Sequence, residues 1–100
     1  MVLLDYLGCA IAGAKSSEAT ILTRTISRLD KGNEATIIGH RARISAPNAA
    51  LVNGTAGHAL ELDDLQWEVR VHPGVAVIPA ALSTAEVKDS KGEDLITGIV

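Results

Sequence analysis

Residues 58–79 read HALELDDLQWEVRVHPGVAVIP, and they concentrate the ionisable chemistry of a chain of 100 residues. The stretch holds two of the three histidines, a cluster of acidic residues, the single tryptophan and two of the three prolines. The sequence on both sides is rich in alanine, valine, leucine and isoleucine. Ionisable clusters in apolar surroundings are frequent at active sites. We therefore expect residues 58–79 to form part of an active site on a helical scaffold.

The composition bounds the class of protein. Hydrophobic residues make up 47% of the chain, which excludes a disordered segment. The net charge of −3 is scattered, with no Lys/Arg stripe and few aromatic residues, so the sequence gives no support for nucleic-acid binding. A chain of this size buries only about two thirds of its unfolded surface. We therefore expect further chain or a second copy to cover its apolar helices, as in a homo-oligomer.

The apolar N-terminal run, MVLLDYLGCAIAGA, does not fit the pattern of a signal peptide or of a membrane span. It lacks a basic start, Asp5 and Tyr6 interrupt it, and it is shorter than the ~20 residues that span a bilayer. No signal peptide or membrane segment is predicted. The single cysteine, Cys9, cannot form an internal disulfide, and a reducing cytoplasmic location is the expectation.

The spacing of apolar residues predicts an all-α chain with about five helices. Ser16 is a capping residue for the second helix, and Ser45-Ala46-Pro47 is typical of the start of the third. The expected ranges are 2–13, 17–30, 47–61, a helix with Pro79 in its first turn that ends near Lys88, and a helix that starts at Glu93-Asp94.

Residues 35–45, ATIIGHRARIS, interrupt this helical pattern. β-Branched residues before Gly39 and alternating residues after it predict a short extended segment or hairpin. His40 beside two arginines is compatible with an anion site or with a solvated turn.

The expected helix 47–61 places chemical groups on one face. His58 and Glu61 are three residues apart and would share that face, with Asp64 a little to one side and Asp63 pointing away. Burial among alanines would suit Glu61 to proton transfer near neutral pH. The alternative is that Glu61 and Asp64 are a solvated helix end, although acids there oppose the helix dipole.

His72 precedes a Pro73-Gly74 break and the expected start of the next helix. Free N–H groups at a helix start bind carboxylates, so a substrate carboxylate held there would lie near His72 and Glu61. This arrangement favours proton abstraction next to a carboxyl group. Trp67 is interpreted as a packing anchor. A metal site from His58, Asp64 and His72 remains an alternative, but no HxxxH or HxH pair fixes two ligands on one element, and no metal is predicted.

Three segments also carry a resemblance to a known family. The strings LLDYLGCAIAGA, ISAPNAALVNGTAGHALELDD and HPGVAVIPAALSTAE resemble the N-terminal part of the MmgE/PrpD family. That family includes 2-methylcitrate dehydratase, cis-aconitate decarboxylase and iminodisuccinate epimerase. The resemblance implies that residues 1–100 are part of the large helical domain of a two-domain protein, usually a homodimer, and that the smaller lid domain lies outside them.

The resemblance also implies an activity. Family members act without metal or organic cofactor on small di- and tricarboxylates, by proton abstraction next to a carboxylate. In the decarboxylase, active-site positions match Glu61, Leu65 and His72. We therefore expect His72 and Glu61 to be catalytic, and Asp64, His58 and Leu65 to contact substrate.

This sequence departs from the family pattern at two of those positions. The family commonly has Asp where Glu61 stands, and often Thr where Leu65 stands. These departures weaken a decarboxylase assignment and leave dehydratase or epimerase open. Further catalytic Lys and His residues are expected beyond Val100, so residues 1–100 alone are predicted to be inactive. The alternatives are a truncated, non-catalytic helical association module and a metal-binding helical domain.

Overall fold

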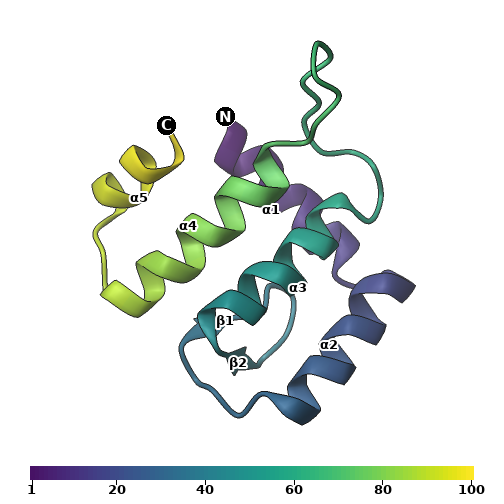
Figure 1. The fold of residues 1–100 in the computed structure, drawn as a ribbon, viewed down its shortest axis with the longest axis vertical. Helices are drawn as coiled ribbons and strands as arrows, with labels where there is room; N and C mark the ends of the chain where they lie inside the picture. Colours follow the sequence, from purple (N-terminus) through teal and green to yellow (C-terminus); the bar gives the residue numbers. More distant parts are fainter.

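A computed structural model describes residues 1–100 and confirms a mostly helical chain with one small hairpin. The elements are α1 (Val2–Gly13), α2 (Ser17–Leu29), β1 (Ala35–Thr36), β2 (Arg43–Ile44), α3 (Ala46–His58), α4 (Gly74–Lys88) and α5 (Gly92–Ile99) (Figure 1). Helix α3 lies at the centre and packs against α1, α2, α4 and the hairpin. None of the helices has both the length and the apolar character that a membrane span requires.

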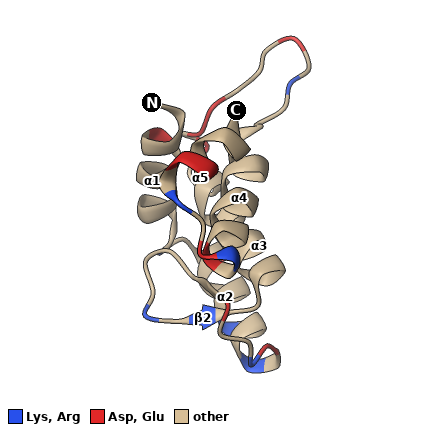
Figure 2. Ribbon diagram, turned by 90° about the vertical axis from the view of Figure 1, so that its left-hand side faces the viewer, with Lys and Arg blue, Asp and Glu red and all other residues tan.

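Side-chain hydrogen bonds cap the starts of two helices, and the first of them was predicted at Ser16. The Ser16 hydroxyl accepts a hydrogen bond from the Ala19 N–H at 3.1 Å, which satisfies one free donor at the start of α2. At the start of α5, the Asp94 carboxylate accepts a hydrogen bond from the Lys91 N–H at 3.3 Å. Charged residues lie mainly in the loops and near the ends of the elements (Figure 2).

Two predicted boundaries are wrong. Helix α3 ends at His58 instead of residue 61, and α4 begins at Gly74, so Pro79 lies inside α4 and not in its first turn. Proline has no N–H, so the carbonyl of Val75 has no helical partner there. That carbonyl lies against Gly54 of α3, where a Cβ would approach its oxygen to 2.7 Å. The close contact between α3 and α4 thus occurs where the proline interrupts the hydrogen bonding of α4.

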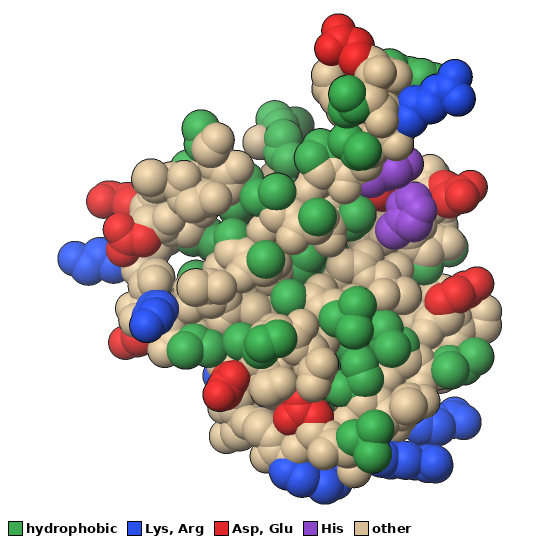
Figure 3. All heavy atoms as spheres, in the orientation of Figure 1, with side chains coloured by type: hydrophobic (Ala, Val, Ile, Leu, Met, Phe, Trp, Pro, Cys, Tyr) green, Lys and Arg blue, Asp and Glu red, His purple; other side chains and the backbone are tan.

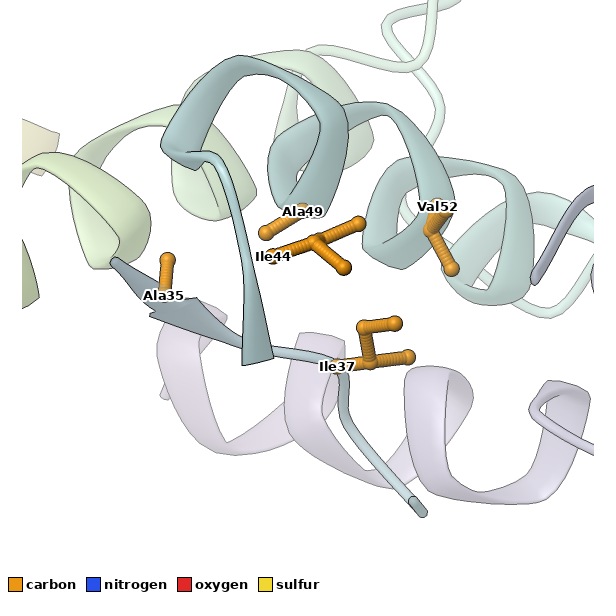
Figure 4. Packing of buried hydrophobic residues seen from close by; sticks show 5 residues of the cluster. All are labelled: Ala35, Ile37, Ile44, Ala49 and Val52. Atoms are coloured by element: carbon orange, nitrogen blue, oxygen red, sulfur yellow. The ribbon is translucent and has the colours of Figure 1, made fainter. Parts of the chain in front are cut away.

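The hairpin closes one of the two hydrophobic clusters. Its strands pair in an antiparallel register, Ala35 with Ile44 and Thr36 with Arg43, which confirms the extended segment expected in residues 35–45. Figure 4 shows five buried side chains between the hairpin and α3. They are Ala35, Ile37, Ile44, Ala49 and Val52. Their burial fixes the hairpin under α3, while His40 remains exposed in the turn.

The second cluster joins α1 to α4. Tyr6 and Ala10 of α1 pack with Ile78 of α4, and all three are buried. Small residues also let α1 come close to α3: a Cβ at Gly57 of α3 would come within 2.8 Å of the Tyr6 ring, and one at Gly13 of α1 would overlap the carbonyl oxygen of Ala56.

Asn53 connects both clusters through hydrogen bonds. Its side chain is buried, and its Oδ1 accepts from the Ile38 N–H at 2.9 Å while its Nδ2 donates to the Thr36 carbonyl at 2.9 Å. Its own carbonyl accepts a hydrogen bond from the Tyr6 hydroxyl at 3.0 Å. Burial raises the pKa of the Tyr6 hydroxyl, so it stays protonated as the donor. One residue of α3 is thus bonded to the hairpin and to α1.

Asp30 ties the end of α2 to the start of α3. Its carboxylate accepts hydrogen bonds from the Ser45 hydroxyl, the Asn48 side chain at 2.7 Å and the Gly32 N–H at 2.8 Å. These bonds, the one from Ser45 first, lower the pKa of Asp30 from 3.8 to about 2. The carboxylate therefore stays ionised at the positive end of α3.

Several large apolar side chains remain exposed. Leu4 and Ile11 of α1 are 69% and 61% exposed, and Ile21 of α2 is 65% exposed. Figure 3 shows hydrophobic side chains over much of the visible face. The expectation that a second copy covers such faces stays a prediction.

Gly13 should tolerate no side chain, whereas Gly8 of the same helix should. Gly13→Ala would force the Ala56 carbonyl away and should destabilise the protein by roughly 1–3 kcal/mol. Gly8→Ala meets nothing within 4 Å and should stabilise α1 by about 0.5–1 kcal/mol. Urea unfolding followed by far-UV circular dichroism measures both. Equal stability of the two variants would contradict the close approach.

Asn53→Leu should destabilise the protein far more than Tyr6→Phe. The leucine leaves the Ile38 N–H and the Thr36 carbonyl buried without partners, at a cost of roughly 2–4 kcal/mol. The phenylalanine removes a single donor and should cost about 0.5–1.5 kcal/mol. Thermal unfolding of the two variants beside the parent protein checks the order, and a reversed order would count against the role given to Asn53.

Candidate active site

The candidate site lies where α3 ends and α4 begins. Between these helices the chain runs through two aspartates into a loop that projects from the body (Figure 1). The feet of this loop are joined by a hydrogen bond from the Gln66 N–H to the Val71 carbonyl at 2.9 Å. The loop therefore returns close to where it left, which brings Asp63 and Asp64 next to His72.

Asp63 is the centre of the site. Its side chain is only 2% exposed, and both of its carboxylate oxygens lie 3.0 Å from Nδ1 of His58. Its Oδ2 also lies 3.0 Å from Nδ1 of His72. The two imidazoles meet edge to face, with centroids 4.6 Å apart and planes at 62°. One buried carboxylate thus contacts two histidines from different helix ends.

Both imidazoles reach the surface on the side away from Asp63. The side chain of His72 is 29% exposed and that of His58 is 46% exposed. The Nδ1 atom of His72 is itself buried. Figure 3 shows histidine side chains together at the surface, at the base of the projecting loop. Each ring is therefore held from inside and accessible to a small molecule from outside.

The prediction that Asp63 points away from the site is wrong. The prediction that His58 and Glu61 share one face of a helix is also wrong. Helix α3 stops at His58, and Glu61 lies in a turn with a positive φ of 52°. Helical spacing does not apply beyond His58, so Asp63 turns inward and Glu61 is exposed. The prediction assumes a continuous helix through residue 61, and residues 59–63 contain no glycine or proline that would mark the break.

Asp64 caps helix α4. Its carboxylate accepts a hydrogen bond from the Gly74 N–H at 3.0 Å, and a Cβ on Gly74 would overlap that carboxylate. The start of α4 was expected to hold a substrate carboxylate, but at Gly74 a carboxylate of the chain itself fills that place. Asp64 thereby fixes the turn that carries His72.

The remaining candidates lie at the margin of the site. Leu65 is half-buried at the start of the projecting loop. Trp67, in the same loop, is 80% exposed, so its interpretation as a packing anchor is wrong within this chain. A mainly apolar groove of about 770 Å³ lies between α1, α4 and α5, and its lining includes Asp64 but neither imidazole.

The side chains of the site include the donor types that bind metals. The residues that come together differ by one from the set that the sequence suggested. His58, Asp63 and His72 place one ligand atom each within 4.8 Å of one another, and Asp63 takes the place of Asp64. Zinc accepts imidazole and carboxylate ligands but needs a fourth ligand for tetrahedral coordination.

Cys9 is unsuited to nucleophilic chemistry. It is buried in α1, and burial raises the pKa of its thiol, with Asp5, Asp63 and Asp64 adding to the effect. A thiolate is therefore disfavoured there.

Comparisons with known proteins point to one family and cover most or all of the chain. Residues 1–100 match the family model described as the MmgE/PrpD N-terminal domain. A cis-aconitate decarboxylase-like protein, oryM, of Aspergillus oryzae is 28% identical over 100 residues, covering 98% of this chain and 20% of that protein. The cis-aconitate decarboxylase of Homo sapiens is 31% identical over 87 residues, covering 85% and 18%. The mouse (Mus musculus) decarboxylase is 31% identical over 100 residues, covering 95% and 20%.

The chain therefore spans about a fifth of the length of the curated relatives it matches. No solved structure matches it.

Asp64→Ala should destabilise the protein by about 0.5–2 kcal/mol, because the Gly74 N–H at the start of α4 loses its acceptor. Asp64→Asn keeps an acceptor and should lower the free energy of unfolding by only about a few tenths of a kcal/mol, since asparagine caps helices about as well as aspartate. Chemical denaturation of the two variants tests this pair. If both lost the same stability, charge and not capping would explain the role of Asp64.

Proposed function

The chain belongs to the MmgE/PrpD family, and we propose that it is the N-terminal part of a lyase or related isomerase that acts on small di- or tricarboxylates. The relatives named cis-aconitate decarboxylases support lyase chemistry at the level of the family. The reactions open to this chain are dehydration, decarboxylation and epimerisation. They share proton transfer at a carbon close to a carboxylate.

The observation that carries this proposal is the pair of partly exposed imidazoles over the buried carboxylate of Asp63. In our proposal His72 is the general acid/base, working through Nε2, because its Nδ1 faces Asp63. As a base, Nε2 takes the proton of a C–H bond, and the electron pair stays on carbon, delocalised toward the neighbouring carboxylate. A positioned imidazole contributes roughly 10²–10⁴-fold to such a step.

The other candidates take supporting roles in the proposal. Glu61 is exposed beside the cluster, so it serves as a second acid/base only when substrate or further protein closes over it. His58 and Leu65 contact substrate at the rim, and Asp64 acts through the turn before α4. The departure at Leu65 leaves the choice among the three reactions to experiment.

Recognition of a substrate with several carboxylates requires cations, and this region supplies few. Arg70 is the only Lys or Arg between residues 44 and 87. The other lysine and arginine residues lie near the hairpin, in or beside α2, at the end of α4 and before α5 (Figure 2). We therefore propose that the remainder of a longer protein, including a lid domain, supplies the cationic groups and a further Lys and His. Cytoplasmic location and a homodimer belong to the same proposal.

One alternative has support of its own. The exposed apolar side chains of α1 and α2 favour a non-catalytic association module. That reading requires no function for the imidazoles, so the histidine variants below separate the two.

The full-length protein should turn over at least one of cis-aconitate, 2-methylcitrate and iminodisuccinate. His72→Gln should lower kcat by roughly 10²–10⁴-fold, because the acid/base is lost. His40→Gln is the matched control, since His40 is exposed in the hairpin turn, and its activity should equal that of the parent protein. Product formation is followed by NMR for each substrate.

Two results would count against the proposal. Turnover of none of the three substrates by the parent protein would reject the substrate class. Unchanged turnover in His72→Gln would reject the catalytic role of His72 and favour the association module.

A further inference from the structure

We propose that Asp63 is a positioning residue that holds His58 and His72 in the Nδ1–H tautomer, so that both present a free Nε2 to the substrate. The inference rests on the proposed function. It assigns a role to Asp63, whose side chain the sequence pattern predicted to point away from the site. It concerns how the imidazoles are oriented, and it needs no knowledge of which carboxylate is bound.

The contacts of Asp63 carry the first step. Its side chain is almost completely buried, and the polar atoms within hydrogen-bonding distance are the Nδ1 atoms of His58 and His72, each at 3.0 Å. No arginine, lysine or backbone N–H donates to it. A buried carboxylate without donors is strongly destabilised. The protons that stabilise Asp63 must therefore come from the two imidazoles.

The proton on His58 follows directly, because its Nδ1 is hydrogen-bonded to both oxygens of Asp63. The Nδ1 of His72 lies equally close to Oδ2 but is not aligned for a hydrogen bond, and it has no other partner. An unprotonated Nδ1 would point a lone pair toward a carboxylate oxygen at 3.0 Å, which is repulsive. A proton on Nδ1 turns the same contact into an attraction, and a small rotation of the ring aligns it.

The consequence for chemistry is a fixed polarity in both rings. A neutral imidazole with its proton on Nδ1 has its lone pair on Nε2, the nitrogen that does not face Asp63. When Nε2 of His72 accepts a proton, the imidazolium is stabilised by the carboxylate of Asp63 behind it. A carboxylate that orients and stabilises a histidine in this way is worth up to about 10⁴-fold in rate in enzymes where it has been replaced.

Asp63→Asn tests this with little change in shape. The amide presents one oxygen and one NH₂ group, so it can accept from one imidazole but must donate to the other. The imidazole that receives the NH₂ must then carry its proton on Nε2. Asp89→Asn is the control, because Asp89 is exposed at the far end of α4 with a positive φ that asparagine also adopts.

The tautomers are read from ¹⁵N NMR of the full-length protein labelled at histidine, and kinetics are measured on the same samples. We expect both imidazoles of the parent protein and of Asp89→Asn to carry the Nδ1 proton. In Asp63→Asn one of them should switch, with kcat lower by on the order of 10²–10⁴-fold and KM changed by a few-fold at most. Loss of packing alone would not move a tautomer.

Three outcomes would overturn the proposal. They are an Nε2-protonated His72 in the parent protein, unchanged tautomers and kcat in Asp63→Asn, and stoichiometric zinc bound by His58, Asp63 and His72 in the purified protein. If Asp63→Asn does not fold, His58→Gln is measured instead. In that variant His72 should keep its Nδ1 proton, and a His72 protonated on Nε2 would reject direct control by Asp63. A parent protein with the expected tautomers but no turnover of carboxylates would reject the proposed function and leave the control of tautomers by Asp63 in place.

Discussion

The hydrogen bonds of Asn53 are the constraint on which the other packing depends. Helix α3 is rich in small residues and has little apolar volume with which to hold its neighbours. The buried amide bonds the backbone of the hairpin, and the Tyr6 hydroxyl bonds the backbone of α3 at the same residue. Buried polar groups are costly unless paired, so these bonds select one arrangement of α1, α3 and the hairpin. That arrangement holds α3, which ends at His58, in place against its neighbours.

The candidate site follows from the two helix ends that this packing holds together. His58 closes α3, His72 precedes α4, and the close contact at Gly54 sets the distance between these helices. Neither helix bears the site on its face. The side chains converge because the connecting segment is tied at Asp64 to the start of α4.

The sequence predicted the helices and the hairpin because their signals are local. A capping serine at Ser16 and β-branched residues in 35–45 act over a few neighbours, and the structure confirms both. The errors arose where tertiary contacts decide. Residues 59–63 contain no glycine or proline, so the pattern extends α3 too far and predicts Asp63 on the wrong side. Pro79 reads as a helix start, but it is tolerated inside α4 where the freed carbonyl meets Gly54. The roles of His72 and Glu61 came from residue type and resemblance and stay predictions.

The bridge between Gln66 and Val71 has a consequence for the evolution of such a domain. It joins the outgoing and returning segments of the projecting loop, and Trp67 lies beyond it in the tip. Residues inserted or lost beyond the bridge would lengthen or shorten the tip without moving Asp63, Asp64 or His72. The tip is therefore free to diverge in length and sequence, for instance to suit different neighbouring surfaces, while the geometry of the carboxylate and the imidazoles is inherited unchanged.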